Sequence, residues 1–404
     1  MKVIVLASNN AHKVQEIQSI FTEYNLDIYI ISQKEFLGDN NIDIEETGST
    51  LQENAMIKAD AIYSLTGLPV LADDTGLEVS SLDFAPGVYS ARYAGEHGND
   101  SANRNKLLIA LAQKTDRTAR FRTVLHYKDS HQSFSIDGIC QGNIIDRERG
   151  NNGFGYDSLF IPIEQSLTFA EMSDISKNQI SHRALAAKSM ALHLSTIHHS
   201  HHIPQEIIYC ILISVLASMN KAEELSRLLQ KAFEYGYTYD MMYEALLQVY
   251  LFAGFPATLE ALSVLHEVYG WQSNKKLEEY NVELFTQRGK ATCKQIYTHV
   301  YDTMMNKLHM ISPEISEWMI IEGYGKTLSR PGLSLQQREL CIIAILAAGN
   351  WKNQLYSHIR GALLLGIKPA IIKETCSYLL IYKLITEYHS AIAILSILTK
   401  DKTQ

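Results

Sequence analysis

The spacing of apolar residues changes at residues 196–204, and this change limits what the chain can fold into more than any other feature. Before it, short apolar runs such as residues 3–7 alternate with segments of helical spacing, which predicts alternating strands and helices. After it, helical spacing continues without a competing strand pattern. We therefore expect an α/β domain over 1–195, a linker over 196–204 and an all-helical domain over 205–404.

Length and composition agree with more than one packed domain. The chain has 404 residues, 46% of them hydrophobic, which is enough for a core and excludes a disordered or disulfide-dependent protein. Residues 1–195 carry 17 basic and 25 acidic side chains, whereas residues 196–404 carry 19 of each, and the net charge is −8. This balance argues against a nucleic-acid or anionic-membrane binder, although nucleotides remain possible substrates.

The cysteines and the apolar stretches indicate a cytoplasmic protein. The five cysteines are scattered, without paired or metal-like spacing, which favours reduced thiols. The N-terminus becomes polar too soon for a signal peptide, and the longest apolar stretch, residues 207–217, is shorter than the ~20 residues that span a bilayer. We expect no membrane partner and no nucleic-acid partner.

The helical half repeats itself weakly at an offset of 130 residues. The matching pairs are Ala232 and Ala362, Gly236 and Gly366, Glu244 and Glu374, Ala261 and Ala391, and Leu265 and Leu395. This ordered self-similarity predicts two repeats, at about 205–270 and 325–399. In the linker, the histidine-rich run 198–202 could hold a transition metal, but a solvated linker is the simpler interpretation.

Polar residues follow the first apolar run, where a helix is predicted to begin. Ser8, Asn9 and Asn10 stand at that turn, and Lys13 follows them. Helix N-termini attract anions because unpaired N–H groups and the helix dipole point at the ligand. These residues form a candidate phosphate site, although a surface turn with a solvated lysine has the same pattern.

Two acidic pairs offer oxygen ligands for Mg²⁺. Glu45-Glu46 and Asp73-Asp74 each stand beside a Thr and a Gly, and the second pair follows the apolar residues 70–72. Mg²⁺ prefers carboxylates and keeps several waters, one of which a further carboxylate can deprotonate. Solvated surface pairs are the alternative. A third cluster, of basic and hydrogen-bonding side chains, is formed by Ser176, Lys177, Ser181, His182 and Arg183.

The order and the residues of these motifs resemble those of the RdgB/ITPase family of pyrophosphatases, which act on non-standard purine nucleoside triphosphates. The resemblance covers about residues 1–195 and rests on the motifs SNNAHK at 8–13, EETG at 45–48, ENA at 53–55, ADDTGL at 72–77, APGVYSARY at 85–93, GFGYD at 153–157 and ISHR at 180–183. It implies an elongated mixed sheet with two lobes around a deep cleft. It also implies cleavage of a nucleoside triphosphate to the monophosphate and pyrophosphate. Asn9 departs from the glycine that the family commonly has there.

The resemblance also implies roles for individual residues. Glu45 and Asp74 would bind Mg²⁺, and Asp74 would deprotonate the attacking water, with Asp73 close enough to share that work. Lys13 would be a catalytic cation. The implied substrate contacts are Ser8, Asn9, Asn10 and Lys13 at the triphosphate, Thr75 beside it, Phe154, Gly155, Tyr156 and Asp157 at the base, and Lys177, His182 and Arg183 at the phosphates and the purine edge.

The chemistry fits these residue types. Attack of water on the α-phosphorus spreads charge over phosphoryl oxygens and the leaving pyrophosphate, which fixed cations and a metal stabilise. Hypoxanthine and xanthine present a 6-oxo acceptor where adenine presents a donor, so hydrogen-bond donors aimed there reject adenine. We expect ITP, dITP and XTP to be cleaved far faster than ATP.

The helical half is similar to the carboxymuconolactone decarboxylase-like (AhpD-like) family, on residues 333–366 and, more weakly, 225–265. The peroxidase-type members of that family rely on a CxxC pair near the position of Gln354 to His358. This pair is absent here, which argues against thiol peroxidase activity.

Three interpretations of the helical half stay open. His358 with Glu244 or Glu374 could perform acid–base chemistry on a small acid, as in the decarboxylase branch. His358 could instead be an ordinary helix residue satisfied by its neighbours. The apolar helix faces could also form an interface between copies of the chain, since the family tends to assemble into rings. We expect a homo-oligomer.

Overall fold

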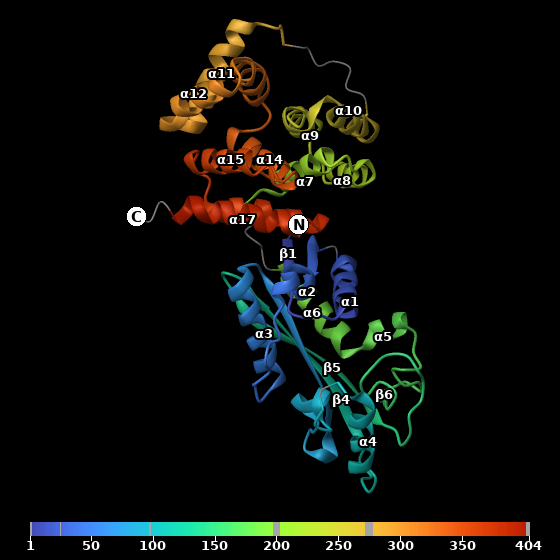
Figure 1. Cartoon of the computed structure of the whole chain (residues 1–404). Coiled ribbons are helices and arrows are strands. Elements are labelled where there is room, and N and C mark those ends of the chain that lie inside the picture. The colour runs from blue at the N-terminus through green and yellow to red at the C-terminus, as the bar shows by residue number, and fades with distance from the viewer. Residues whose placement is uncertain (1, 25, 97, 197–202, 271–277, 401–404) are drawn as a thin grey trace. The chain divides into compact units, whose positions relative to one another are not determined.

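The computed structural model divides into two compact units, Met1–His199 and Ser200–Gln404 (Figure 1). We call them the first unit and the helical unit. The structure describes residues 2–24, 26–96, 98–196, 203–270 and 278–400. The histidine-rich run 198–202 lies outside these residues. Within them, no helix is long and apolar enough to cross a membrane.

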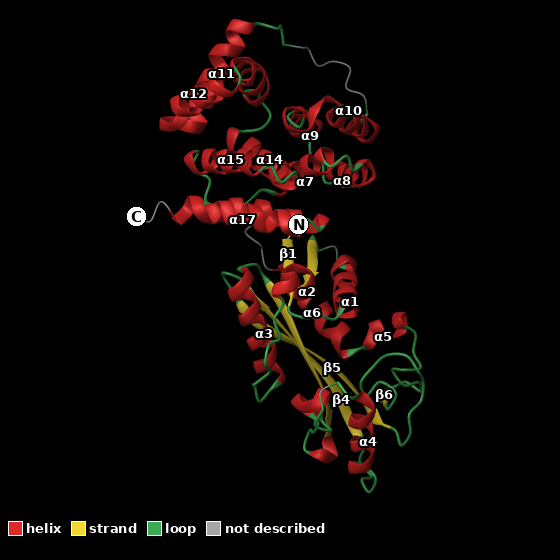
Figure 2. Cartoon of the chain, in the orientation of Figure 1, coloured by secondary structure: helices red, strands yellow, loops and turns green. Residues whose placement is uncertain are grey.

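The first unit is built on one mixed six-stranded sheet (Figure 2). The strands are β1 Lys2–Leu6, β2 Ile28–Ser32, β3 Val70–Val79, β4 Thr118–Lys128, β5 Ser133–Ile144 and β6 Phe160–Pro162, in the order β2-β1-β3-β4-β5-β6. β1 runs parallel to β2 and β3, and the remaining neighbours are antiparallel. The predicted fold class, a mixed sheet followed by a helical region, is confirmed.

Local signals explain where the helices of the first unit begin. They are α1 Ala11–Glu23, α2 Gln33–Leu37, α3 Leu51–Thr66, α4 Asp100–Ala110, α5 Asp174–Ile180 and α6 His182–Thr196. The side chain of Asn10 caps α1 by accepting hydrogen bonds from the backbone N–H groups of His12 and Lys13. Thr50 and Glu53 form a capping box at the start of α3, which satisfies N–H groups that have no partner inside the helix.

β3 joins two separate apolar cores. Leu71 belongs to a core with residues of α1, α6, β1 and β2, whereas Leu77 belongs to a core with Phe121 and Phe160. The acidic pair Asp73-Asp74 lies within a strand, because β3 continues past the apolar residues 70–72 to Val79. Pairing with β4 along the whole of β3 satisfies the backbone groups on one of its edges and extends the strand.

One edge of β3 is open beside the acidic pair. β1 pairs with β3 only at residues 70 and 71, so beyond this point the β1 side of β3 has no ladder partner among the described strands. Adjacent residues of a strand point to opposite faces of the sheet. At an open edge, a cavity can therefore reach side chains on both faces.

The helical unit contains α7 Gln205–Ser218, α8 Ala222–Glu234, α9 Tyr239–Leu247, α10 Tyr250–Tyr269, α11 Val282–Tyr297, α12 Tyr301–Ile311, α13 Pro313–Trp318, the π-helix η5 Met319–Leu328, α14 Leu335–Ala348, α15 Lys352–Leu364, α16 Pro369–Ser377 and α17 Ile385–Lys400. Short 3₁₀ segments connect some of them. Over 203–270 and 278–400 the structure has no strand.

The 130-residue offset recurs in the helix boundaries. α14, α15 and α16 begin and end 130 residues after α7, α8 and α9. The turns repeat as well. Asn220 and Asn350 have φ of 55° and 54°, and Gly236 and Gly366 have φ of 76° and 83°. Left-handed φ at corresponding positions shows that the two segments share a backbone path and not only a composition.

Candidate active site

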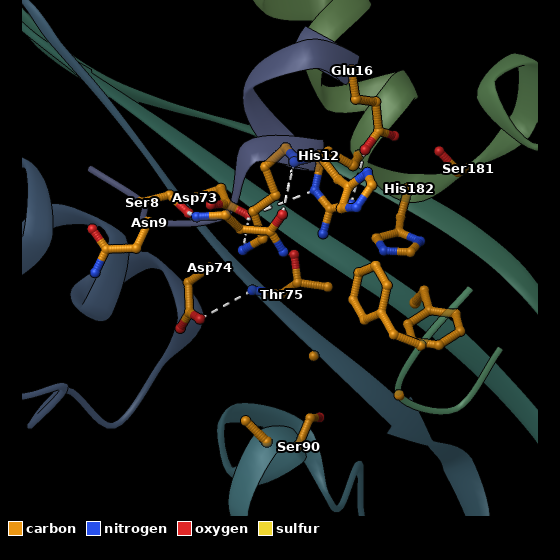
Figure 3. Close-up of a pocket in the computed structure, with 18 of the residues that line it drawn as sticks. Ser8, Asn9, His12, Glu16, Asp73, Asp74, Thr75, Ser90, Ser181 and His182 are labelled. Carbon is orange, nitrogen blue, oxygen red and sulfur yellow. Dashed lines mark hydrogen bonds and ion pairs between the residues drawn. The ribbon is translucent and has the colours of Figure 1, made fainter. Parts of the chain in front are cut away.

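A cavity of about 970 Å³ opens in the first unit beside the free edge of β3. Side chains from the turn before α1, from α1 itself, from β3 and from the start of α6 surround it (Figure 3). All but one of the predicted site residues line it, namely Ser8, Asn9, Asn10, Lys13, Asp73, Asp74, Thr75, Phe154, Gly155, Tyr156, Asp157, Lys177, His182 and Arg183. Segments far apart in the sequence thus meet in one hollow.

The exception is Glu45. It is exposed and is not among the described residues that line the cavity, whereas its neighbour Glu46 does line it. Of the two adjacent glutamates, the structure thus places Glu46, and not the predicted Glu45, at the cavity.

Asp73 is buried on the face of β3 that meets α1 and α6. One of its carboxylate oxygens lies 2.7 Å from Nζ of Lys13 and 3.6 Å from Nε of Arg183. Burial opposes the charge of Asp73, but the surrounding cations prevail and hold its pKa well below the ordinary value. Asp73 is thus a fixed anion that positions Lys13 and Arg183.

Asp74 is on the opposite face and has the opposite titration behaviour. Burial raises its pKa to about 6, and Glu46 adds to the rise, although Nζ of Lys58 lies 3.7 Å away and lowers it. Oδ1 accepts a hydrogen bond from the N–H of Thr75 at 3.0 Å. Oδ2 is buried and has no hydrogen-bond partner among the described residues. A carboxylate with a free oxygen and a pKa near neutrality suits a general base.

Lys58 of α3 is a cavity residue that the sequence analysis missed. Its ammonium lies 2.8 Å from the carboxylate of Glu46 and reaches Asp74 as well. Burial disfavours its charge, but the nearby carboxylates raise its pKa overall. The signal was present in the sequence, because Lys58 falls at helical spacing on the buried face of α3, with Asn54, Ala55 and Ala59. A lysine on an apolar stripe marks a paired or functional group.

The start of α1 brings N–H groups and a cation to the cavity. The N–H of Asn10 donates to Oγ of Ser8 at 3.2 Å, which shapes the turn before the helix. Burial lowers the pKa of Lys13, and the contact with Asp73 offsets part of this effect. The arrangement has the parts of an anion site: a helix N-terminus, small polar side chains and an ammonium group.

Known proteins are similar to this chain over its first unit. The Ham1 family matches residues 4–193. A dITP/XTP pyrophosphatase of Christiangramia forsetii is 47% identical over 194 residues, which are 48% of this chain and 98% of that relative. One from Porphyromonas gingivalis is 47% identical over 195 residues, 47% of this chain and 96% of the relative.

This chain belongs to the Ham1 family. A solved structure of the Staphylococcus aureus Ham1 protein is 42% identical, covering 48% of this chain and 98% of that one, with a TM-score of 0.45. The family match ends at residue 193, so the helical unit lies outside it. We call the first unit the Ham1 unit from here on.

A short loop of the Ham1 unit presents an aromatic ring to the cavity. Phe154 is 54% exposed, and its ring centroid lies 5.6 Å from Nζ of Lys177 and 5.9 Å from the guanidinium carbon of Arg183. Gly153 has φ of 79°, and a Cβ there would lie 2.2 Å from Oδ2 of Asp157. The glycine thus lets Asp157 hold the loop from inside and leaves the ring free for stacking.

Tyr156 and His182 line the cavity but are anchored in the fold. The hydroxyl of Tyr156 donates to the carbonyl of Ser90 at 2.9 Å. His182 stacks on Phe121, with ring centroids 4.6 Å apart, and burial together with neighbouring cations lowers its pKa well below the ordinary value. His182 is therefore neutral at physiological pH. Gly138 of β5 admits this segment, because a Cβ there would lie 2.0 Å from the carbonyl oxygen of His182.

In the helical unit, the structure changes the candidate partner of His358. Its Nδ1 lies 2.9 Å from Oε2 of Glu339, which is 1% exposed. Glu244 instead accepts hydrogen bonds from the guanidinium groups of Arg330 and Arg338. The predicted pairing of His358 with Glu244 or Glu374 is therefore replaced by a pairing with Glu339. The sequence signal for this pair was Glu339 itself, an acidic residue within the mostly apolar, buried helix α14.

The carboxylate of Glu374 accepts a hydrogen bond from the hydroxyl of Tyr378 at 3.0 Å.

Among the described residues, no group of three or more His, Cys, Asp or Glu side chains has the geometry of a preformed metal centre. Two carboxylates that line the cavity, those of Glu46 and Asp74, are of the kind that Mg²⁺ uses together with waters.

Proposed function

We propose that the Ham1 unit hydrolyses non-standard purine nucleoside triphosphates (ITP, dITP and XTP) to the monophosphate and pyrophosphate, and so removes them from the nucleotide pool. The supporting observation is the cavity itself. It holds a carboxylate of raised pKa, Asp74, together with Lys13, Lys58 and Arg183. The dITP/XTP pyrophosphatases to which the chain is similar act on such substrates.

In this proposal the phosphates bind along the cations. Lys13 and the N-terminus of α1 hold the triphosphate, and Arg183, fixed by Asp73 and Glu16, adds a second positive charge. Asp74 takes the proton of a water whose oxygen attacks the α-phosphorus. The bond from that phosphorus to the oxygen it shares with the β-phosphate breaks, and pyrophosphate leaves. The cations stabilise the negative charge that develops on the leaving group.

Glu46 and Asp74 are the residues that would hold Mg²⁺. They fit a hard cation because both are carboxylates and because Oδ2 of Asp74 is buried without a hydrogen-bond partner among the described residues. When bound, Mg²⁺ would neutralise phosphate charge and polarise phosphoryl oxygens. Glu46→Gln should raise the Mg²⁺ concentration needed for half-maximal activity, and Glu45→Gln is the matched control.

The base would stack on Phe154, where Lys177 and Arg183 lie beside the ring. The ammonium group of Lys177 donates hydrogen bonds and accepts none, which suits the 6-oxo group of hypoxanthine or xanthine and not the amino group of adenine. The test is steady-state turnover of ITP, dITP, XTP and ATP by the full chain. The proposal requires kcat/KM for each of the first three to be at least ~10²-fold higher than kcat/KM for ATP. Equal turnover of ATP refutes it.

For the helical unit we propose an accessory role in assembling copies of the chain. The support is apolar surface: Met310, Ile311 and Phe255 are 80%, 73% and 70% exposed, and large exposed apolar side chains favour association. Light scattering on the full chain tests this proposal, since a mass of one chain at micromolar concentration contradicts it.

A second candidate for the helical unit is acid–base catalysis on a small acid, as in a decarboxylase or lactone-processing enzyme. The contact of His358 with the buried Glu339 favours it, because a carboxylate fixes the tautomer and orientation of a histidine. The tautomer of His358, measured by ¹⁵N NMR in the full chain and in Glu339→Gln, tests it. An unchanged tautomer in the variant speaks against a working pair.

A further inference from the structure

Two charged side chains of α4 hydrogen-bond to one residue, Gly155, of the loop that carries Phe154. The N–H of Gly155 donates to Oδ2 of Asp100 at 2.7 Å, and Nη1 of Arg104 donates to the carbonyl oxygen of Gly155 at 2.9 Å. Asp100 and Arg104 are four residues apart and so lie on one face of the helix. From that face, Asp100 therefore accepts from the backbone N–H of Gly155 and Arg104 donates to its backbone carbonyl.

Arg104 is held in place by a further contact, with Glu148. Nε of Arg104 lies 3.0 Å from the carboxylate of Glu148, which also accepts a hydrogen bond from the hydroxyl of Ser158 at 3.0 Å. Glu148 and Ser158 flank the loop on either side in the sequence. The guanidinium of Arg104 thus lies between the carbonyl of Gly155 and the carboxylate of Glu148, with which it forms an ion pair.

The loop needs such support. Gly153 and Gly155 adopt left-handed φ values of 79° and 62°, and glycines lose more backbone freedom on ordering than other residues. Phe154, between them, is more than half exposed, so little apolar packing holds its ring. Asp157 supports the loop at Phe154 through the N–H of that residue, at 3.0 Å. Asp100 and Arg104 support the two peptide groups that follow, on either side of Gly155.

We propose that Asp100 and Arg104 are positioning residues that keep the ring of Phe154 at the height of the nucleobase, and thereby set the affinity for the nucleoside part of the substrate. This inference rests on the proposed function. It predicts that loss of these two contacts weakens binding of the base and leaves binding of the phosphates unchanged. Lys13 and Asp73 have no hydrogen bond or ion pair to α4 among the described residues.

The experiment compares Asp100→Ala with Asp100→Asn in the full chain. The asparagine retains an acceptor oxygen for the N–H of Gly155, whereas alanine does not. Two quantities are measured for each protein: KM for ITP, and the Kd of inorganic tripolyphosphate, which has no base. Asp116→Ala is the matched control, because Asp116 accepts a backbone N–H, that of Thr118 at 2.9 Å, at an exposed position that does not line the cavity.

For Asp100→Ala we expect KM for ITP to rise about tenfold, because one charge-assisted hydrogen bond is lost. The Kd of tripolyphosphate should stay within twofold of wild type. In Asp100→Asn, KM for ITP should be close to the wild-type value. The inference is overturned if KM stays within twofold of wild type in Asp100→Ala, or if the Kd of tripolyphosphate rises with it. A wild-type chain that does not turn over ITP overturns the proposed function and, with it, this inference.

Discussion

At the scale of single residues, the candidate site depends on two adjacent aspartates with opposite electrostatics. Asp73 and Asp74 are neighbours in β3 and point to opposite faces of the sheet. Asp73 meets Lys13 and Arg183, whereas Asp74 meets Glu46 and a more distant Lys58. Nothing in the dipeptide distinguishes them, and the difference comes from what packs on each face.

Asp74→Asn should abolish most activity and stabilise the protein at neutral pH. The pKa of Asp74 in the folded state, about 6, lies above its ordinary 3.8, so ionisation disfavours the folded state as pH rises between these values. Asparagine removes this penalty, which is at most about 3 kcal/mol. Urea unfolding at pH 7.5 measures the gain. In the wild type, kcat/KM should rise with pH around 6, and a flat profile from pH 5 to 8 contradicts the role of Asp74 as base.

Asp73→Asn should have the opposite effect on stability. The variant leaves Lys13 and Arg183 near each other without their shared anion, which costs about 3 kcal/mol. Because the folded-state pKa of Asp73 lies below its ordinary value, this contribution is present above about pH 4 and fades as pH falls toward the folded pKa. Urea unfolding at pH 7 and pH 3 should therefore show a larger deficit at pH 7. Equal deficits at both pH values would exclude an electrostatic origin.

At the scale of elements, α3 contributes chemistry as well as packing. Its apolar face is buried beside β3 and carries Lys58 into the cavity between Glu46 and Asp74. The capping box at Thr50 and Glu53 defines where the helix starts, and the helical repeat then decides that Lys58 faces inward. A two-residue shift of the start would turn Lys58 toward solvent.

Lys58→Met should lower kcat at least tenfold and raise the apparent pKa of activity above 6. Methionine keeps the length and apolar stem of lysine, so α3 can pack as before, but the charge that lowers the pKa of Asp74 is lost. The measurement is the pH dependence of kcat/KM for ITP. Lys128→Met is the control, since Lys128 pairs with Asp60 of the same helix but does not line the cavity. An unshifted profile in Lys58→Met would remove Lys58 from the site.

At the scale of the whole molecule, each unit has its own interior. In the helical unit, Glu244 of α9 is paired with Arg338 of α14, both nearly inaccessible, and with Arg330 in the turn before α14. This cluster ties the first set of repeated helices to the second. A buried carboxylate that pairs with two guanidinium groups stabilises the fold. Its loss leaves uncompensated positive charge inside the unit.

Glu244→Gln should destabilise the helical unit by about 3 kcal/mol while ITP turnover stays at the wild-type level. Calorimetric unfolding of the full chain should show one transition moved to lower temperature. Glu278→Gln is the matched control, because Glu278 pairs with Arg288 at the surface, where an ion pair contributes little. A parallel loss of turnover in Glu244→Gln would show that the two units are coupled.

Sequence reasoning reached most of the candidate site because its motifs are local. The cap at Asn10, the acidic pair in β3 and the glycine loop at 153–157 each have a local signature, and all of them line the cavity. It chose Glu45 where the structure places Glu46 at the cavity, because which of two adjacent side chains faces inward depends on what packs opposite them. It also missed Lys58 and Glu339, which are recognisable only by their position on buried helix faces.

The amino-acid sequence by itself determined the class of each half, the start of the first helix and the 130-residue offset, because periodicity and capping act over a few neighbouring residues. Only the tertiary structure decided that β3 continues through the acidic pair, that Asp74 rather than Asp73 has a raised pKa, and that Glu46 faces the cavity. Burial and charge at one point are sums over segments distant in the chain, and those sums exist only once the chain has folded.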